Sequence, residues 1–375
     1  MPLAFRLASF YFVFFLYAGV LVAYFPAYLA WRGLSAGEIA WILALPQIAR
    51  VFAPALWGTL ADLTGAQRAI VLFACAVNAA SFAMVPFFDG FGALALLIGI
   101  AAVLSAGALP LVEAITLGAL AQTPGRYGPI RLWGSLGFIA VVLAGGLWLD
   151  WQGISTVAVA IAAFAAASLG VSLWLPSSGA QAPRQPSFAL QWTLAMRAVL
   201  GAGFCMSLAH GALYAFFTLH LQRQGYSGTA IGALWTLGVV AEIGVFIALP
   251  ALFRRYALSS ILLASFGCAV LRFLAIAWLA GQVWILVLAQ LLHAATFGAF
   301  HAASVAAVHR VFPAHAHGRG QTLFSGVAYG AGGAAGALLA GWAWEAAGPG
   351  LAFSLSALAG AAGAFLAYAM KRAGF

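Results

Sequence analysis

The feature that most restricts the fold of this chain is a series of long apolar runs separated by short polar segments. Each run is close to the ~20 residues that a helix needs to cross the hydrocarbon core of a bilayer. Because a helix satisfies its own backbone hydrogen bonds in lipid, we expect an all-α integral membrane protein with twelve transmembrane helices. The runs cover approximately residues 7–29, 39–60, 69–88, 92–120, 130–149, 152–175, 197–219, 230–252, 258–278, 283–309, 321–343 and 350–370.

Composition supports a lipid environment and excludes several classes of function. Of the 375 residues, 65% are hydrophobic and only 6% are charged, whereas soluble domains carry about 25% charged residues. The net charge of +9 would suit a nucleic-acid binder if the basic residues formed one patch. They fall mostly between the apolar runs instead, so we expect the lipid bilayer as a partner and no nucleic acid.

The basic residues also predict the orientation in the membrane. If the N-terminus is cytoplasmic, eleven basic residues lie in inside segments and only Arg32 and Arg223 lie in outside loops, which is the positive-inside pattern. The first run lacks a small-residue cleavage site, so we expect a first span and not a signal peptide. We therefore expect a multi-pass protein of the cell (inner) membrane with both termini cytoplasmic. The inside residues are Arg6, Arg68, Arg126, Arg184, Arg197, Arg254, Arg255, Arg310, Arg319, Lys371 and Arg372.

The chain carries a weak internal duplication. The segment "RGLSAGEI" (32–39) aligns with "QGYSGTAI" (224–231) at an offset of 192 residues, and each segment joins the first two spans of its half. Between the halves, "PSSGAQAPRQPS" has the Pro, Ser and Gly content of a linker. A six-plus-six repeat is typical of transporters whose binding site lies between the halves. We expect a six-helix bundle over 1–175, a cytoplasmic linker over 176–196 and a second six-helix bundle over 197–375.

A glycine-rich stretch, "SGVAYGAGGAAGALLAG" (325–341), places small residues at four-residue spacing. A phosphate-binding loop would need a preceding strand and a helix start, and the pattern around this stretch predicts neither. Small residues at this spacing favour close packing between membrane helices.

Five charged residues fall inside predicted spans, where each costs ~3 kcal/mol even on a lenient insertion scale. Glu113 and Arg131 lie at similar distances from one hairpin turn, so they can meet at one depth. Arg50 and Glu242 are 192 residues apart, so the duplication places opposite charges at equivalent depths of the two halves. With Arg272, these groups are expected to face a bundle interior or an aqueous cavity. Each pair is also consistent with a purely structural role.

Two histidines, His293 and His301, lie eight residues apart and hence on one face of a predicted helix. Beside the intramembrane Arg272 and Glu242 they favour a proton relay. The rise of a helix separates them by ~12 Å, too far to share one metal ion, so we expect no metal site. His210, in another span, is a further candidate for the relay.

The segment between the second and third spans, "GTLADLTGAQR" (58–68), resembles the gating motif of the major facilitator superfamily, with Leu63 where a basic residue is usual. The motif falls on Gly58, Asp62, Gly65 and Arg68. The resemblance implies the major facilitator fold of two six-helix bundles.

The sequence shows no pattern of an enzyme active site. It offers no nucleophile with its base and no clustered metal ligands, so we do not expect an enzyme.

The fourth and fifth spans resemble the lactose permease branch of this superfamily. "PLVEA", followed by "YGPIRLWGSLGF", is similar to the sugar-binding stretch of that branch. The resemblance carries its glutamate and arginine onto Glu113 and Arg131, its cysteine onto Ser135 and its stacking tryptophan onto Phe138.

The substrate and proton site of the same branch falls on the second half of the chain. Its carboxylate, arginine and histidine fall on Glu242, Arg272 and His293, and "HGALYAFFT" puts His210 at an aspartate. Two positions depart from the pattern: Gln290 replaces a lysine and Thr296 replaces the carboxylate that carries the proton. The proton carrier is therefore to be sought in Glu242 and the histidines.

The sequence resembles the phenylpropionate permeases more closely, over essentially the whole chain. The shared stretches include "YGPIRLWGS", "LWTLGVVAEIGVF", "LFRRY" and "QLLHAATFGAFH". Arg50 also fits an arginine in the second helix of that family. The resemblance implies a permease for aromatic acids.

Together these patterns predict a proton-coupled symporter that imports a small organic solute by alternating access. Three cavity arginines outnumber two carboxylates, which with the resemblance favours an aromatic or other small organic acid. A sugar or nucleoside is the alternative solute, and a receptor or non-transporting scaffold would share the same pattern. We expect a monomer that binds a small-molecule substrate and protons, with no cofactor beyond the proton gradient. The expected substrate-binding residues are Glu113, Arg131, Arg50, Trp133, Ser135, Phe138 and Glu242, and the expected proton-coupling residues are Glu242, Arg272, His293, His301 and His210.

Overall fold

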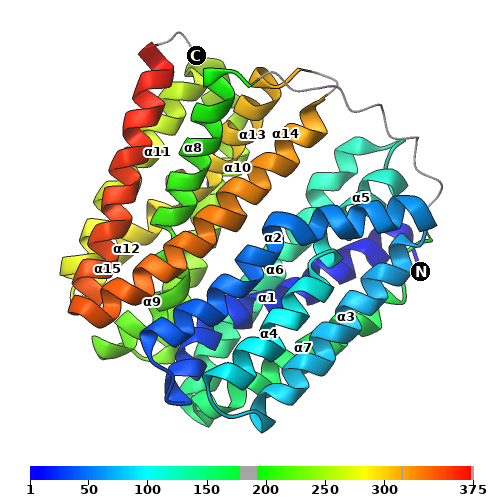
Figure 1. The fold of residues 1–375 in the computed structure, drawn as a ribbon, viewed down its shortest axis with the longest axis horizontal. Coiled ribbons are helices and arrows are strands. Elements are labelled where there is room, and N and C mark those ends of the chain that lie inside the picture. The colour runs from blue at the N-terminus through cyan, green and yellow to red at the C-terminus, as the bar shows by residue number, and fades with distance from the viewer. Residues whose placement is uncertain (178–191, 314–315, 373–375) are drawn as a thin grey trace. The chain divides into compact units, whose positions relative to one another are not determined.

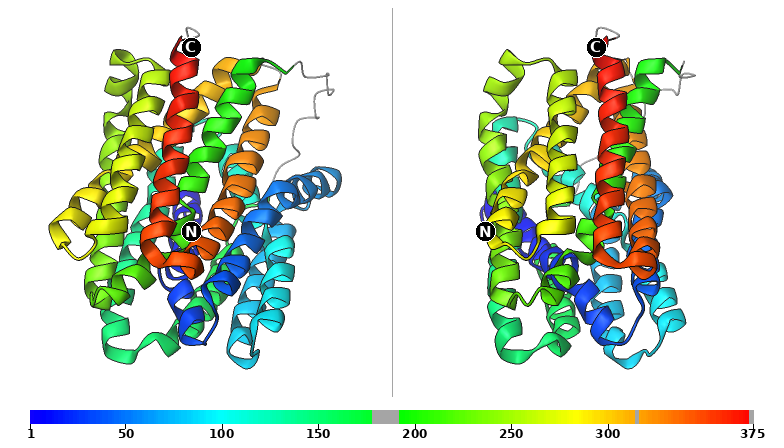
Figure 2. Two further views of the ribbon diagram at one scale, coloured as in Figure 1. Left: turned by 60° about the vertical axis from the view of Figure 1, so that its left-hand side comes forward. Right: turned by 90° about the vertical axis from the view of Figure 1, so that its left-hand side faces the viewer.

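The computed structural model describes residues 1–177, 192–313 and 316–372, and within them it is helical with no β-strand (Figure 1, Figure 2). The α-helices are α1 (Leu3–Trp31), α2 (Ala36–Thr64), α3 (Gln67–Met84), α4 (Phe91–Ser105), α5 (Ala108–Ala119), α6 (Tyr127–Gln152), α7 (Val157–Ser172), α8 (Leu194–Ala209), α9 (Gly211–Arg223), α10 (Gly228–Arg255), α11 (Leu258–Leu279), α12 (Val283–Leu291), α13 (Phe300–Val311), α14 (His317–Phe324) and α15 (Gly333–Arg372). Two π-helices, η4 (Ala294–Ala299) and η6 (Ser325–Gly332), join α12 to α13 and α14 to α15.

Eleven of the described helical segments are long and apolar enough to cross a membrane. The last of them has 56 residues, which as one straight helix would extend ~84 Å against a hydrocarbon core of ~30 Å. Ala347 and Gly348 interrupt it with non-helical backbone angles, so it forms two helical arms. The described residues therefore form twelve helical segments of membrane-crossing length, and the predicted all-α membrane fold is confirmed.

The duplicated segment has the same local structure in both halves. Gly33 and Gly225 each follow the end of a helix with a φ of +84°, a left-handed conformation that glycine adopts without steric cost. Ser35 and Ser227 precede the next helix, and each side chain accepts a hydrogen bond from the backbone N–H three residues later, at 3.3 Å and 3.2 Å. The repeated residues therefore recur because they end one helix and cap the next.

The structure divides into two compact units, each built mainly from one half of the sequence. The predicted linker over 176–196 falls largely on residues 178–191, outside the described residues. Each unit also includes an N-terminal part of the second helix, α2 or α10, of the other half. The first unit comprises Met1–Leu34, Phe52–Arg184 and Ser227–Gly232, and the second comprises Ser35–Val51, Gln185–Tyr226 and Ala233–Phe375.

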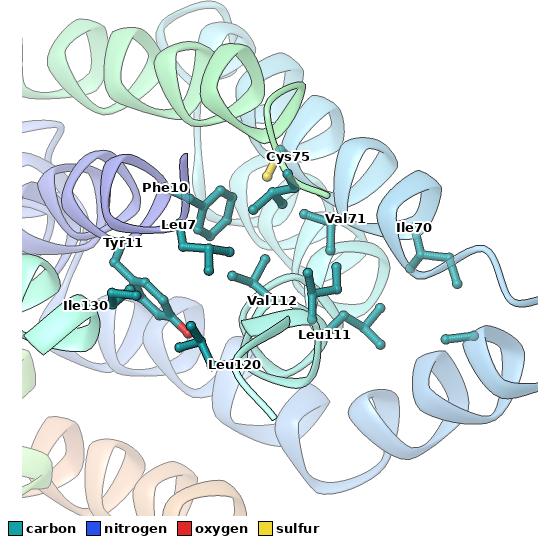
Figure 3. Packing of buried hydrophobic residues seen from close by; sticks show 13 residues of the cluster. Leu7, Phe10, Tyr11, Ile70, Val71, Cys75, Leu111, Val112, Leu120 and Ile130 are labelled. Atoms are coloured by element: carbon teal, nitrogen blue, oxygen red, sulfur yellow. The ribbon is translucent and has the colours of Figure 1, made fainter. Parts of the chain in front are cut away.

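In the first unit α1 packs against α6 and α7, and α3 packs against α4, α5 and α7. Figure 3 shows the buried apolar cluster to which α1, α3, α5 and α6 contribute. Gly137 on α6 allows the close approach of α1, because a Cβ there would lie 2.2 Å from the carbonyl oxygen of Phe12. The chain bends between α4 and α5 at Gly107, where the side chain of Trp57 packs, and the Trp57 indole N–H donates to the carbonyl of Val103 at 2.8 Å.

In the second unit α15 packs against α8, α9 and α11, and η6 packs against α8. The glycine-rich stretch 325–341 provides several of these contacts. A Cβ on Gly332 would lie 2.7 Å from the carbonyl oxygen of Phe204, and one on Gly336 would lie 2.6 Å from that of Leu208. The predicted close helix packing is confirmed, since larger residues would overlap a neighbouring backbone.

Candidate functional site

The first unit contains the predicted Glu113–Arg131 pair. Glu113 lies on α5 and Arg131 on α6, and the Nε atom of Arg131 is 3.9 Å from Oε1 of Glu113, so the predicted meeting of the two side chains is confirmed. This distance allows an ion pair but is too long for a hydrogen bond. The two side chains are 31% and 39% exposed, which leaves donors and acceptors available to a ligand.

Two aromatic rings of α1 frame the guanidinium of Arg131. Its central carbon lies 4.4 Å from the ring centre of Phe15 and 5.4 Å from that of Tyr11, within cation–π distance. The Tyr11 hydroxyl donates to Thr116 on α5 at 3.3 Å, which orients the ring. The sequence pattern did not indicate these two residues as site residues. The signal that could have found them is the aromatic run "FYFVFF" in the first span.

Helix α6 places the other predicted binding residues on two different faces. Ser135 and Phe138 follow Arg131 by four and seven residues, which brings all three to one face at ~100° per residue. Trp133 follows by only two residues and points ~200° around the helix. Its ring packs edge-on against Phe12 at a centroid distance of 6.1 Å, and the residue is 47% exposed. Trp133 therefore does not share the face of the ion pair.

The second unit buries Arg272 among neutral hydrogen-bond acceptors, with 1% of the residue exposed. One terminal nitrogen donates to Nδ1 of His293 and to the hydroxyl of Thr296, both at 3.0 Å, and lies 3.5 Å from Nε2 of His210. The other terminal nitrogen donates to Oε1 of Gln290 at 2.7 Å. These bonds replace the water that the guanidinium loses on burial.

The same hydrogen bonds give the two residues that depart from the lactose permease pattern a common partner. Gln290 and Thr296 stand where that pattern has a lysine and a carboxylate, and here each accepts a hydrogen bond from Arg272. A lysine at position 290 would repel the guanidinium, whereas an amide oxygen accepts from it. The sequence showed the two substitutions but not their common partner.

The hydrogen bonds also define which nitrogens of two histidines carry hydrogen. A guanidinium only donates, so Nδ1 of His293 and Nε2 of His210 act as acceptors toward Arg272. Nδ1 of His210 donates to the carbonyl of Met206 at 2.9 Å. The remaining hydrogen of His293 is on Nε2, which lies 3.8 Å from Oε2 of Glu242. Arg272 therefore donates to His293, whose Nε2–H faces Glu242 at a distance too long for a hydrogen bond.

A stack of rings continues from His293 along the same helix. His293 stacks on Phe297 at a centroid distance of 5.4 Å, and Phe297 stacks on His301 at 6.2 Å, which confirms the predicted common face of the two histidines. The π-helix η4 lies between them, a form frequent at functional sites. Nδ1 of His301 is 2.5 Å from the hydroxyl of Tyr329 in η6, a residue that the sequence pattern did not indicate.

Arg50, near the middle of α2, belongs to the second unit. The next residue, Val51, packs against η6, where a Cβ on Gly330 would lie 2.7 Å from Cγ2 of Val51. This contact brings α2 alongside the π-helix that carries Tyr329. Arg50 is close enough to Tyr329 and Tyr214 to interact with them electrostatically.

Arg50 is an exposed residue, unlike Arg272. In the part of the chain that the structure describes, Arg50 has no ion-pair or hydrogen-bond partner. Its duplication counterpart Glu242 is directed toward Nε2 of His293. The interpretation that Arg50 and Glu242 face each other across a cavity stays a prediction.

The predicted gating motif forms the connection between α2 and α3. Gly65 has a φ of +66°, a conformation that favours glycine. The guanidinium of Arg68 donates to the carbonyl of Leu173, which ties the start of α3 to the segment after α7. Gly58 and Asp62 lie in the last turns of α2. The gating role of these residues stays a prediction.

Comparisons relate the chain to known proteins. A family model described as "MFS_1 like family" matches residues 4–355. A "Probable 3-phenylpropionic acid transporter" of Escherichia coli (strain K12) is 32% identical over 203 residues, or 52% of this chain and 53% of that protein. A "Maltose permease" of Geobacillus stearothermophilus is 30% identical over 273 residues, or 72% of this chain and 69% of that protein. The matched region thus spans about half the length of the first relative.

Solved structures provide a comparison of the fold. The crystal structure of the nucleoside transporter NupG matches with a TM-score of 0.82 at 21% sequence identity, covering 99% of this chain and 99% of that one. At this identity the likeness shows the fold alone. Together with the family match, it confirms the predicted major facilitator fold.

Proposed function

Since the chain belongs to the MFS_1 like family, we propose that it is a proton-coupled transporter that imports a small aromatic acid. The observation that carries the proposal is Arg50, which is exposed, lies within electrostatic reach of Tyr214 and Tyr329 and has no ion-pair partner among the described residues. The E. coli relative is named as a probable transporter of 3-phenylpropionic acid, which belongs to this class.

The three intramembrane arginines differ in a way that supports an anionic substrate. Arg272 is surrounded by protein acceptors, and Arg131 is paired with Glu113. Arg50 offers a fork of donors that no described residue fills. A carboxylate can accept two hydrogen bonds from one guanidinium, a geometry stronger than a single neutral bond. We assign the substrate carboxylate to Arg50.

The rings of η4 and η6 suit an aromatic substituent. Tyr329, which interacts electrostatically with Arg50, contacts His301, and His301 stacks on Phe297. Stacked and edge-to-face ring pairs contribute about 0.5–1.5 kcal/mol beyond the burial of apolar area. The ring of the substrate is assigned to this face of η4 and η6.

Glu242 is the proposed proton carrier. His293 and His210 already direct their unprotonated nitrogens at Arg272, so protonation of either ring would remove a hydrogen bond and place a second cation beside the guanidinium. Protonation of Glu242 instead removes a negative charge 3.8 Å from His293 and leaves the acceptors of Arg272 in place. The histidine thus orients the carrier.

Coupling follows from the charge of the site. One proton adds a positive charge and one monovalent acid adds a negative charge, so the empty site and the doubly loaded site have the same net charge. A site loaded with one partner keeps an extra charge within the membrane, which is costly. Ligands shift an equilibrium between two orientations only by their differential affinity. This arrangement favours symport of one proton with one monovalent acid.

The distribution of basic residues further supports an inner-membrane location with both termini in the cytoplasm. Import then requires protons and substrate to enter from the outside. The predicted monomeric state is part of the same proposal.

Uptake by the purified, reconstituted chain tests the proposal. Proteoliposomes with an inward proton gradient should accumulate labelled 3-phenylpropionate, and a protonophore should abolish the accumulation. Arg50→Gln should lose uptake, whereas Arg126→Gln, a matched change in the segment before α6, should keep it. Absence of accumulation in the parent protein, or parental uptake by Arg50→Gln, would rule the proposal out.

A sugar or nucleoside is the second candidate substrate. The partly exposed Glu113–Arg131 pair favours it, because a carboxylate and a guanidinium together can accept from and donate to neighbouring hydroxyls. A bound ligand raises stability according to its affinity, so thermal unfolding with each compound class separates the candidates. Stabilisation by maltose or uridine, without stabilisation by 3-phenylpropionate, would replace the first candidate by the second.

A further inference from the structure

Two carboxylates outside the site described above bind the first turns of α2 and α10. In the first unit, Asp150 on α6 accepts hydrogen bonds from the backbone N–H groups of Gly228 at 2.6 Å and Thr229 at 2.8 Å, and from the Thr229 hydroxyl at 2.6 Å. In the second unit, Glu345 on α15 accepts from the backbone N–H of Gly37 at 2.7 Å. The first N–H groups of a helix lack intrahelical partners, and the helix dipole there favours a negative charge.

In both units the carboxylate and the helix start come from different halves of the sequence. Gly37 and Thr229 are 192 residues apart, so the duplication makes them equivalent. Asp150 lies at the end of the fifth predicted span of the first half, and Glu345 lies at the end of the fifth predicted span of the second. The fifth helix of each half therefore holds the second helix of the other half, and the relation is reciprocal.

Close backbone contacts accompany each carboxylate. A Cβ on Gly146 would lie 2.3 Å from the carbonyl oxygen of Gly228, and a Cβ on Gly341 would lie 2.4 Å from Cβ of Ala40. Larger side chains at these positions would push the helices apart. The glycines thus permit the contact, and the carboxylates supply charge-assisted hydrogen bonds at its rim. Both carboxylate residues are exposed, so water can replace these bonds when the helices separate.

We infer that Asp150 and Glu345 are two reciprocal latches on the side of the membrane that the sequence predicts to be outside, and that both release when that side opens. The inference rests on the proposed transport function only in requiring alternating access. Alternating access needs contacts between the halves that form and break in every cycle. A few exposed hydrogen bonds to backbone amides meet this need, because their loss exposes no buried charge.

A cysteine reporter tests the latches without any substrate. The three native cysteines are replaced by alanine, and Ser135→Cys on the predicted binding face of α6 is labelled by a membrane-impermeant maleimide added outside right-side-out vesicles. Asp150→Asn and Glu345→Gln remove the charge and keep the shape. Each should speed labelling about three- to tenfold, the range expected for loss of a helix cap. The Asp150 change should have the larger effect because it weakens three hydrogen bonds. The double variant should multiply the two effects.

Asp89→Asn is the matched control. Asp89 is also exposed and is ion-paired at 2.6 Å with Arg32, but both residues belong to the first half and to one unit. Its neutralisation should leave the labelling rate unchanged. Parental labelling rates in both latch variants and in the double variant would overturn the inference, and so would an equal increase in the control.

A covalent latch provides the opposite test and does not depend on the folding of the charge variants. Oxidation of the pair Asp150→Cys and Thr229→Cys should stop outside labelling of the reporter at position 135, and reduction should restore it. Unchanged labelling of the cross-linked protein would also overturn the inference. Because neither readout involves transport, a failure here is distinct from a failure to accumulate 3-phenylpropionate.

Discussion

The charged groups of the two units are arranged in opposite ways. In the first unit, Glu113 and Arg131 approach each other without a hydrogen bond and remain partly exposed. In the second, Arg272 is buried and donates to acceptors from both of its terminal nitrogens. A buried charge persists only where protein groups replace water, whereas an exposed pair keeps capacity for a ligand. The first arrangement suits binding, and the second suits the orientation of neighbouring groups.

Removal of Arg272 should have the largest effect. Arg272→Ala leaves four buried neutral acceptors without their donor, and each buried group left unsatisfied costs about 1–3 kcal/mol. We expect a large fall in the midpoint of thermal unfolding in detergent and loss of uptake. Arg131→Ala is the control and should unfold close to the parent midpoint. Equal midpoints for the two variants would show that the two units do not differ in this way.

Disruption of the first pair tests the expectation from the sequence that Glu113 and Arg131 also contact the substrate. Glu113→Gln and Arg131→Ala should each weaken substrate binding by about 30- to 900-fold and leave the fold intact, as expected when a central charged contact of about 2–4 kcal/mol is lost. Calorimetric titration measures the affinity, and thermal unfolding serves as the control for folding. Retention of parental affinity in either variant would reduce the pair to a structural ion pair.

Neutralisation of Glu242 should uncouple substrate transport from proton movement. Glu242→Gln resembles the protonated carboxyl group, so exchange of substrate across the membrane should continue. A pH gradient of one unit should no longer produce its roughly tenfold accumulation, equivalent to about 1.4 kcal/mol. Uptake driven by a pH gradient is compared with exchange in the same vesicles. Persistent pH-driven accumulation would show that a group other than Glu242 carries the proton.

The smallest effect concerns the two faces of α6. Phe138→Ala should weaken binding by about tenfold, since it removes a ring from the face of Arg131. Trp133→Ala should change affinity by less than about twofold, because the ring lies ~200° away around the helix. The same titration measures both variants. A larger effect for Trp133 than for Phe138 would contradict the expectation that the Arg131 face of α6 contributes to substrate binding.

Several features of the site could be predicted because they depend on neighbours in the sequence. Glu113 and Arg131 meet because they lie at similar distances from the hairpin turn that joins their two helices. His293 and His301 share a face because one helix carries both. The tautomers of His293 and His210 could not be predicted in this way, since they depend on hydrogen bonds to Arg272 from other helices. Phe15 and Tyr329 were missed for the same reason.

By itself, the sequence determined the number of crossings, the duplication and the residues that end and cap the paired helices. These properties are local, because burial of an apolar run in lipid and capping of a helix end involve residues close in the chain. Only the tertiary structure decided which acceptors surround Arg272, which rings frame Arg131, and that each half contributes the start of its second helix to the other unit. Such contacts depend on how closely helices pack, which glycines such as Gly137 and Gly336 permit but do not specify.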